Sequence, residues 1–471
     1  MQKEISAEEI TRQKEMIHAL REEFAKRQQP VCAFVETYGC QQNESDSERL
    51  KGMLADMGCV FVSSPKEADI VLYNTCAVRE NAELKVFGNI GALKHQKRKR
   101  PDMLIGVCGC MMQQAHIAET IRKKYPHVDL VFGTHALYRF PALLAEAMQK
   151  GRVFDTADED GAVFEGIPCK RDMPPLAKLP IMYGCNNFCS YCIVPYVRGR
   201  ERSRTVSNIL SEAVQIASEG YKEIMLLGQN VNSYDSDGIH FPELLQKVCA
   251  VDGIERVRFM TSHPKDLSDE LIAVMAAEKK VCNQLHLPVQ SGSDAVLQAM
   301  NRHYTRAHYL RLVEKVRDKI PDIVLTTDII AGFPTETQAD FEDTLSLLQE
   351  VEYDSIFSFI YSRRIGTPAA ALPSVLSDEQ IHRNFERMLT VQNAISKRRN
   401  DAYLGSVQRV LAEGPSKNDP SAMTGRTEGG KVVNFPGTAD LTGRMLDIKI
   451  TRVQTWSLYG ELMKEQNEQK G

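Results

Sequence analysis

The fold follows from the run Met182-Tyr-Gly-Cys-Asn-Asn-Phe-Cys-Ser-Tyr-Cys-Ile193, in which Cys185, Cys189 and Cys192 form a Cys-x3-Cys-x2-Cys triplet. No other cysteine and no histidine lies within ten residues on either side of the triplet. Three soft thiolates on one tight loop suit an iron–sulfur cluster, whose usual complement is four cysteines. One iron would then lack a protein ligand, so a cofactor or a substrate could bind there. Zinc is the alternative, and it would need a distant fourth ligand or a water.

The composition of the chain is that of an ordinary globular protein. It has 471 residues, of which 43% are hydrophobic and 25% charged, and this length predicts roughly two to four domains. No apolar run approaches the ~20 residues that a membrane span needs, and residues 1–29 contain no apolar signal core. We therefore expect a cytoplasmic protein with no membrane partner. The twelve cysteines then indicate metal ligands and buried thiols rather than disulfides.

The N-terminal third alternates short apolar runs with charged amphipathic segments. The apolar runs are residues 31–35, 70–73, 104–107 and 130–132. This alternation predicts a parallel α/β sheet. Cys40, Cys76 and Cys110 each follow a predicted strand, and open α/β sheets bind their ligands at that edge. The sequence thus predicts a second three-cysteine site, against the alternative of three unrelated buried cysteines, and spacing does not decide between Cys108 and Cys110.

The central part of the chain contains six further strand candidates with helical stretches between them. They are residues 180–183, 223–227, 256–261, 284–287, 323–329 and 355–361. Six βα units in succession predict a partial (βα)6 barrel, in which chemistry takes place in the loops at the carboxyl ends of the strands. The cysteine triplet follows the first of these strands. Four further Gly-, Pro- and His-containing loops at the same edge, 228–230, 262–264, 288–292 and 331–334, are therefore pocket candidates.

The last segment, residues 403–463, alternates apolar with polar residues and contains several glycine turns. It predicts a small antiparallel β domain of barrel or sandwich type. Such domains often bind nucleic acid, for which Arg426, Lys431, Lys449 and Arg452 offer charge; a structural cap is the alternative. The expected domains are a charged helical extension at 1–30, an α/β domain at 31–150, a linker at 151–175, the barrel at 176–400, the β domain at 401–465 and a tail at 466–471.

The net charge of −4 hides three local concentrations of positive charge. One lies at residues 94–100, the second consists of Arg198, Arg200, Arg202 and Arg204, and the third is at 397–399. Any one of them alone suits a solvated surface. Three together favour a polyanionic partner. No phosphate-binding Gly-x4-Gly-Lys loop and no dinucleotide fingerprint occurs, which disfavours nucleoside-triphosphate and nicotinamide enzymes.

With these motifs the sequence resembles the radical S-adenosylmethionine enzymes, whose signature Cys185, Cys189 and Cys192 match. It is more closely similar to the methylthiotransferases, in which a three-cysteine α/β domain precedes the barrel and a TRAM β domain follows it. The resemblance covers nearly all of residues 31–463. Segments similar to the branch that modifies isopentenyladenosine in tRNA are 37–43, 74–76, 106–111, 193–200 and 226–234. That branch usually has Met where this chain has Gln42.

The resemblance implies a radical enzyme with two [4Fe–4S] clusters. S-adenosylmethionine would bind the open iron of the cluster on Cys185, Cys189 and Cys192. An auxiliary cluster on Cys40, Cys76 and Cys110 would supply the sulfur. The implied reaction converts N6-isopentenyladenosine at position 37 of tRNA, next to the anticodon, to its 2-methylthio derivative. We further expect Tyr191, Gln229 and Gln290 to border S-adenosylmethionine, and Arg198, Arg200, Arg202 and Arg204 to guide the phosphates of the anticodon stem-loop.

Two kinds of alternative stay open at this point. The same chemistry would serve a threonylcarbamoyl-adenosine tRNA or a ribosomal protein side chain. An electron carrier or an RNA-binding module without turnover belongs to a different class, but carriers normally close their clusters with four cysteines. For the enzyme we expect a monomer that receives electrons from an external flavodoxin- or ferredoxin-like protein.

Overall fold

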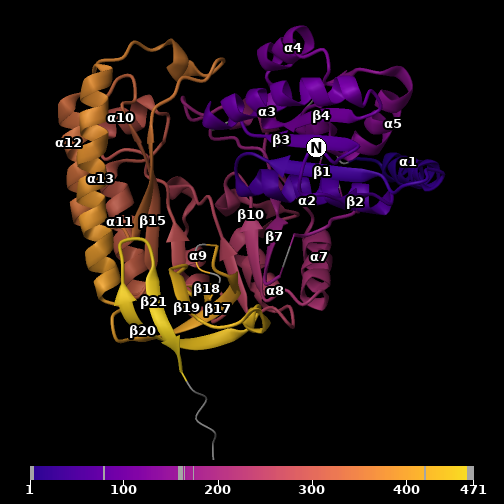
Figure 1. Ribbon diagram of the computed structural model, residues 1–471. Helices are drawn as coiled ribbons and strands as arrows, with labels where there is room; N and C mark the ends of the chain where they lie inside the picture. Colours follow the sequence, from indigo (N-terminus) through magenta and orange to yellow (C-terminus); the bar gives the residue numbers. More distant parts are fainter. Residues whose placement is uncertain are drawn as a thin grey trace, which may run out of the picture. The chain divides into compact units, whose positions relative to one another are not determined.

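The computed structural model describes residues 5–77, 80–157, 163, 165–172, 174–417, 419 and 421–463 (Figure 1). The chain forms two compact units. The first unit comprises Met1–Asp172, Pro180–Phe188 and Cys192–Arg204, and the second comprises Met173–Leu179, Cys189–Tyr191 and Thr205–Gly471. Among the described residues, no helix is both long and apolar enough to cross a membrane.

A six-stranded parallel sheet forms the centre of the first unit. Its strand order is β2-β1-β3-β4-β5-β6, with β1 Cys32–Thr37, β2 Val60–Phe61, β3 Ile70–Thr75, β4 Leu104–Gly109, β5 Leu130–Phe132 and β6 Val153–Asp155. Strands of this kind are buried on both faces and are therefore largely apolar, as in β3, where every residue is buried and only Asn74 and Thr75 at its end are polar. The parallel α/β prediction is confirmed.

Helices cover both faces of this sheet. One apolar core is formed with α1 Ala7–Ala25, α2 Gln41–Asp56 and α5 Phe140–Lys150. The other is formed with α3 Glu80–Lys99 and α4 Ala115–Lys124. Ile17, Leu20 and Phe24 of α1 are buried in the first core. The N-terminal helix is thus an integral part of this unit.

Strand β6 lies within the range expected to be a linker, 151–175. It pairs in parallel with β5, because the chain returns to the sheet after α5. The stretch that follows then packs on α2. The Lys170 amide donates to the Glu48 carbonyl over 2.9 Å, and a Cβ on Gly52 would overlap the carbonyl of Pro168. This close approach holds the proline-rich stretch against the first unit.

The second unit contains the partial barrel. Two three-stranded sheets, β13-β10-β7 and β14-β15-β16, are joined by a parallel bridge between Val257 and Val281. The strands are β7 Leu176–Pro180, β10 Glu223–Leu227, β13 Arg256–Phe259, β14 Gln284–His286, β15 Val324–Ala331 and β16 Ser355–Ile360. The helices between and after them are α7 Val206–Ser218, α8 Phe241–Cys249, α9 Asp269–Ala277, α10 Asp294–Ala299, α11 Arg306–Lys319, α12 Gln338–Val351 and α13 Asp378–Asp401. Figure 1 shows α11, α12 and α13 alongside β15.

The first barrel strand differs from the expected range 180–183. The ladder instead uses β7, which ends at Pro180, and Met182–Tyr183 form β8, which pairs antiparallel with β9 Arg202–Ser203. Proline has no N–H to donate to a ladder, so it ends the strand inside a continuous apolar run. The apolar pattern alone could not mark this break.

The C-terminal segment is a closed five-stranded barrel rather than a sandwich, with the order β17-β18-β19-β21-β20. Its strands are β17 Val407–Pro415, β18 Ala422–Thr427, β19 Val432–Pro436, β20 Met445–Val453 and β21 Leu458–Leu462. Its core consists of the inward residues of each strand, including Val410, Phe435 and Ile448. The alternating pattern therefore predicted the correct inward face.

Two buried arginines fasten this small barrel to the amino ends of the larger barrel's strands. Arg256, at the start of β13, donates to the carbonyls of Arg409 and Arg426 over 2.7 and 2.9 Å. Arg258 donates to the carbonyls of Thr427 and Glu428 and pairs with Glu223 over 2.7 Å. The carboxyl ends of the strands, where the cofactor loops were expected, are thereby left to the opposite side.

We expect Arg258→Ala to destabilise the second unit by about 3–5 kcal/mol, because the buried Glu223 carboxylate loses its hydrogen-bonded partner at 2.7 Å and keeps only Arg256 at 3.9 Å. Chemical denaturation of the full chain, followed by circular dichroism, measures the change. Arg409→Ala is the matched control. Its pair with Asp447 is half-exposed and contributes about 0–1 kcal/mol. Equal effects of the two substitutions would contradict the role given to the buried pair.

Candidate active site

Cys40, Cys76 and Cys110 converge at the carboxyl edge of the first unit's sheet. They follow β1, β3 and β4, which are neighbours in the strand order. Asn43 contacts two of them, with its Oδ1 3.7 Å from the Cys40 Sγ and 3.5 Å from the Cys110 Sγ. Cys76 hydrogen-bonds Cys40, and a Cβ on Gly39 would overlap the Cβ of Cys76. Only glycine allows this close approach.

Cys110, rather than Cys108, joins the other two cysteines. Cys108 ends in the apolar core between the sheet and α2, and burial raises the pKa of its thiol well above its usual value. Gly109 then turns the chain with a φ of 95°, and a Cβ there would overlap the Asn74 side-chain oxygen. The turn brings Cys110 toward Asn43 at the start of a 3-10 helix, η1 Cys110–Gln113.

The surroundings of the three thiols favour the thiolate form at Cys40 and oppose it at Cys110. Cys40 is the N-cap of α2, where backbone N–H groups favour a negative charge. A hydrogen bond from Cys76 and the charge of Arg198 lower the pKa of Cys40 to about 6, against the effect of burial. Burial raises the pKa of Cys110 to about 11, although Arg198 opposes the rise. Metal binding would deprotonate such a thiol outright.

Arg198 lies inside this site. Its side chain is 6% exposed; Nε donates to the Cys110 Sγ over 3.1 Å, and Nη2 donates to Asn43 over 2.8 Å and to Asp46 over 2.7 Å. It is the last residue of a short helix, α6 Val194–Arg198. Ile193 and Val197 pack with Ala77 and Cys110 in a small apolar cluster, and this packing aims Arg198 at the thiols.

The four arginines expected to guide RNA phosphates divide into two kinds. Arg200 is exposed, with its guanidinium 4.3 Å from the centre of the Phe188 ring. The other three are buried and have intramolecular partners, with Arg202 donating to the carbonyls of Arg198 and Arg200, and Arg204 held by Glu165. Phosphate binding stays a prediction, and Arg200 is the member of the set that a phosphate can reach.

The cysteines of the Cys-x3-Cys-x2-Cys triplet, called the barrel triplet below, are divided between the two units. Cys185 and Cys192 belong to the first unit and Cys189 to the second. In the first unit, the Cys185 amide donates to the Gly199 carbonyl over 3.1 Å. In the second, the backbone of Ser190 bonds to Met300 and to Ala369.

A second buried arginine contacts the barrel triplet. Arg302 follows α10 and is 4% exposed. It donates from Nη1 to the Cys189 Sγ over 3.4 Å, from Nη2 to the Pro288 carbonyl over 2.8 Å, and from Nε to the Tyr304 hydroxyl over 2.9 Å. Each cysteine triplet thus has one thiol that accepts a hydrogen bond from a buried guanidinium.

Tyr191, Gln229 and Gln290, which we expected to border S-adenosylmethionine, all belong to the second unit. Tyr191 packs on the cluster around Met300 and Phe333. Gln229 follows β10, and its side-chain oxygen is buried with no hydrogen-bond partner among the described residues. Gln290 follows β14 in a backbone conformation with a φ of 74°, bonded to β15 on both sides. No ligand contact tests these three assignments.

Further buried polar atoms lack partners in the same loops. Within the described residues, Asn232, Ser262 and the Nε2 atom of His263 have no hydrogen-bond partner. Burial and the nearby Arg302 lower the pKa of His263 to about 2, so the ring is neutral. Its Nδ1 accepts the Lys265 amide, which leaves the proton on Nε2 as a donor. Such a set suits a ligand with amino, carboxylate and hydroxyl groups, as S-adenosylmethionine has.

Three residues near the thiols were not expected from the sequence: Asn43 and Arg302, which contact thiols, and Asp46, which anchors Arg198. The sequence contains a signal for Asn43 and Asp46. The first two turns of α2 have polar residues on every side and no apolar face, and the structure buries most of them. Asn43 and Asp46 follow Cys40 at spacings of three and six, which places them on one helix face. No comparable pattern marks Arg302.

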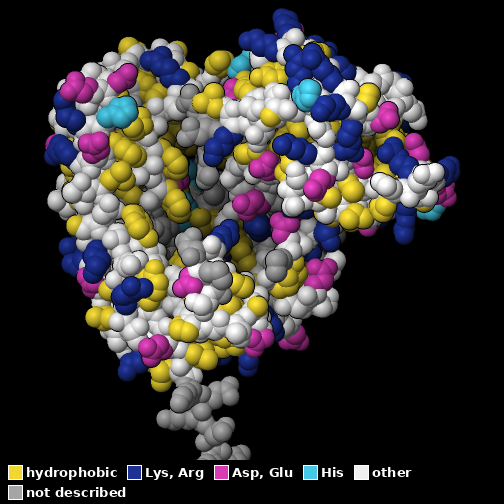
Figure 2. Space-filling model, in the orientation of Figure 1, with side chains coloured by type: hydrophobic (Ala, Val, Ile, Leu, Met, Phe, Trp, Pro, Cys, Tyr) yellow, Lys and Arg dark blue, Asp and Glu magenta, His cyan; other side chains and the backbone are white. Residues whose placement is uncertain are grey.

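The two outer basic clusters are partly neutralised by their own neighbours. On α3 and directly after it, Lys97 pairs with Asp129 and Arg100 with Asp69, whereas Lys94, Arg98 and Lys99 are exposed. On α13, the three cations of residues 397–399 pair with Asp401, Glu352 and Asp354. Figure 2 shows Lys and Arg side chains gathered over the α3 and α4 side of the first unit.

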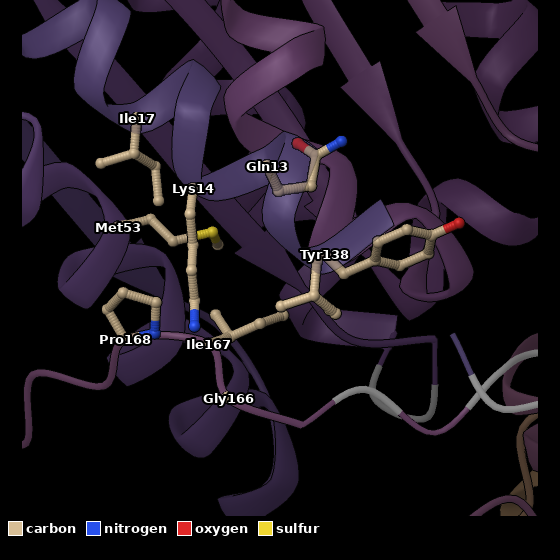
Figure 3. Close-up of a pocket in the computed structure, with 9 residues that line it drawn as sticks. Gln13, Lys14, Ile17, Met53, Tyr138, Gly166, Ile167 and Pro168 are labelled. Atoms are coloured by element: carbon tan, nitrogen blue, oxygen red, sulfur yellow. The ribbon is translucent and has the colours of Figure 1, made fainter. Parts of the chain in front are cut away.

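Two further observations delimit the site. No three His, Cys, Asp or Glu side chains of the described residues stand close enough together to hold a single metal ion. A small pocket of the first unit, shown in Figure 3, contains no cysteine. It is lined by Ile10, Gln13, Lys14, Ile17, Met53, Tyr138, Gly166, Ile167 and Pro168.

Known sequence families match three parts of the chain. Residues 179–348 match the Radical SAM superfamily, residues 32–133 match a family described as uncharacterized protein family UPF0004, and residues 401–463 match the TRAM domain. The three matches correspond to the barrel, the sheet with Cys40, Cys76 and Cys110, and the small β-barrel.

Among solved structures, the fold is similar to a radical S-adenosylmethionine methyltransferase, TsrM, from Kitasatospora setae. The TM-score is 0.55 over 73% of this chain and 75% of that one, at 14% sequence identity. This likeness concerns the fold alone.

Curated relatives extend over nearly the whole chain. The tRNA-2-methylthio-N(6)-dimethylallyladenosine synthase of Acetivibrio thermocellus is 51% identical over 98% of both chains. The enzyme of the same name from Alkaliphilus oremlandii is also 51% identical over 98% of both chains. At this identity and coverage, the chain belongs to the tRNA-2-methylthio-N(6)-dimethylallyladenosine synthase family of radical S-adenosylmethionine enzymes.

Proposed function

We propose that this protein converts N6-isopentenyladenosine at position 37 of tRNA to 2-methylthio-N6-isopentenyladenosine. The observation that carries the proposal is the presence of two separate three-cysteine sets, each with a buried arginine on one of its thiols. The relatives carry the name of this activity. We place the enzyme in the cytoplasm as a monomer that receives electrons from a flavodoxin- or ferredoxin-like protein.

Two [4Fe–4S] clusters form part of the proposal. Cys185, Cys189 and Cys192 would hold one, and Cys40, Cys76 and Cys110 the other. When bound, the clusters and S-adenosylmethionine supply the radical chemistry, the sulfur and the methyl group that the inert adenine C2–H requires. Three cysteines for each cluster leave one iron of each open to a further ligand.

The protein's own residues bind, orient and shield these groups. Ala77, Ile193 and Val197 keep water away from Cys110. Gln229 and His263 offer an acceptor and a donor to S-adenosylmethionine. Arg302 holds the Cys189 thiol by a hydrogen bond.

The small β-barrel would provide an additional binding surface for the RNA. Lys431 and Arg426 are engaged by Asp354 and Glu413. The exposed candidates are Lys449, Arg452 and Trp456, and the Arg452 guanidinium lies 3.8 Å from the centre of the Tyr459 ring. An exposed tryptophan and nearby exposed cations on the same β-barrel suit single-stranded RNA, whose bases stack on aromatic rings.

Removing each cysteine set should separate the two functions. With Cys185, Cys189 and Cys192 replaced by Ala, the reconstituted enzyme should form no 5′-deoxyadenosine from S-adenosylmethionine. With Cys40, Cys76 and Cys110 replaced, it should still form 5′-deoxyadenosine but insert no sulfur into tRNA. Liquid chromatography of the small products and mass spectrometry of the RNA measure both. Replacement of Cys32, Cys59 and Cys249 is the matched control.

If both triple variants lose 5′-deoxyadenosine formation equally, the two cysteine sets do not have the separate roles proposed for them. If the unaltered, reduced enzyme forms none, the protein is an electron carrier or a binding module instead.

Gln229→Leu should weaken binding of S-adenosylmethionine by the cluster-loaded protein about tenfold, or roughly 1.4 kcal/mol, because a buried acceptor is lost. Equilibrium dialysis measures the dissociation constant. Gln246→Leu, on the exposed face of α8, should leave it unchanged. An unaltered constant for Gln229→Leu would remove this residue from the cofactor site.

The substrate is tested by mass spectrometry of tRNA nucleosides from cells that lack the gene. We expect 2-methylthio-N6-isopentenyladenosine to disappear and N6-isopentenyladenosine to accumulate, with recovery on complementation. Loss of methylthiolated threonylcarbamoyl-adenosine instead would shift the assignment to that substrate.

A further inference from the structure

We propose that Arg198 is the resident counter-charge of the auxiliary cluster and makes that cluster easier to reduce, instead of binding an RNA phosphate. The inference rests on the proposed function in one respect, namely that Cys40, Cys76 and Cys110 hold a cluster. No comparison assigns a role to this arginine.

Arg198 is buried together with its acidic partner. The side chain is 6% exposed, and its partner Asp46 is 4% exposed. A guanidinium enclosed in this way is out of reach of a phosphate. A buried charge is costly unless it is paired, so the fold would not keep it there without compensating contacts.

Hydrogen bonds fix the position of the Arg198 guanidinium. Its Nε points to the Cys110 Sγ at 3.1 Å, while its Nη2 is fixed by Asn43 and Asp46. Asn43 in turn touches Cys40 and Cys110. Asp46 therefore anchors the arginine, and the arginine hydrogen-bonds a sulfur that would bind iron.

The charge of Arg198 opposes the charge that the cluster would carry. Three thiolates exceed the charge of an oxidised [4Fe–4S] core by one, so the buried cluster would be negatively charged, and one electron from the external donor would double that negative charge. Arginine stays protonated in both states, so the electron enters without a proton. A hydrogen bond to a ligand sulfur and a nearby positive charge both stabilise the reduced cluster more than the oxidised one. Arg198 should thus raise the midpoint potential.

The test uses the full-length chain with Cys185, Cys189 and Cys192 replaced by Ala, so that iron, sulfide and electron paramagnetic resonance report on the auxiliary cluster. A redox titration gives the ratio of reduced to oxidised cluster at a fixed potential. Arg198→Met should lower this ratio at least tenfold, which is about 59 mV for one electron. Arg200→Met is the matched control, because it removes an exposed guanidinium from the same segment, and it should leave the ratio unchanged.

Two further variants keep the test decisive if Arg198→Met does not retain iron. Arg198→Lys keeps the charge and should stay within about threefold of the parent ratio. Asp46→Asn removes a negative charge and should raise the ratio, a change of sign that a merely structural role would not produce.

An unchanged ratio in Arg198→Met, or a lowered ratio in Asp46→Asn, would overturn the inference. A parent protein that binds no iron would refute the auxiliary cluster of the proposed function, which is a separate outcome. Binding of an anticodon stem-loop gives an independent check. Its affinity and salt dependence should not change in Arg198→Met, and a loss of more than tenfold would restore the phosphate role.

Discussion

Parallel strand pairing is the constraint on which the first unit's site depends. Because β1, β3 and β4 are neighbours and run in the same direction, the loops after them emerge side by side. Cysteines that are far apart in the sequence need only occupy the same place in successive βα units to meet. The close fit of Gly39 against Cys76 and the turn at Gly109 then adjust the last few ångströms.

Burying charged groups beside the thiols costs free energy. At both cysteine sets the buried charge is a guanidinium that hydrogen-bonds a sulfur. Arg198 and Arg302 are both nearly inaccessible to water, and each donates to the sulfur of one cysteine. Arg198 also donates to a carboxylate and a side-chain amide, and Arg302 also donates to a carbonyl and a hydroxyl. The two arginines thus differ in net charge balance, since only Arg198 has an acidic partner among these contacts. This difference separates the electrostatic environments of the two cysteine sets.

The sequence was sufficient for the architecture and for the positions of the cysteines, because both depend on local patterns. Apolar runs predicted the strands, and the loops that follow them contained the thiols. It was insufficient for the arginines after the triplet, whose alternation suggested a solvated cationic strip. Arg198 meets Asp46 across 152 positions of the chain, and no local rule anticipates such a partner. The first barrel strand was misplaced for a similar reason, since Pro180 interrupts the ladder without interrupting the apolar run.

The attachment of the small β-barrel by Arg256 and Arg258 has a consequence for the size of the substrate. These residues lie at the amino ends of the strands, whereas the loops with Gln229 and His263 lie at the carboxyl ends. The eight residues of β15 span about 26 Å between those levels. A molecule that engages both must therefore be at least as long as the barrel is tall. A free nucleoside is too short to contact both levels.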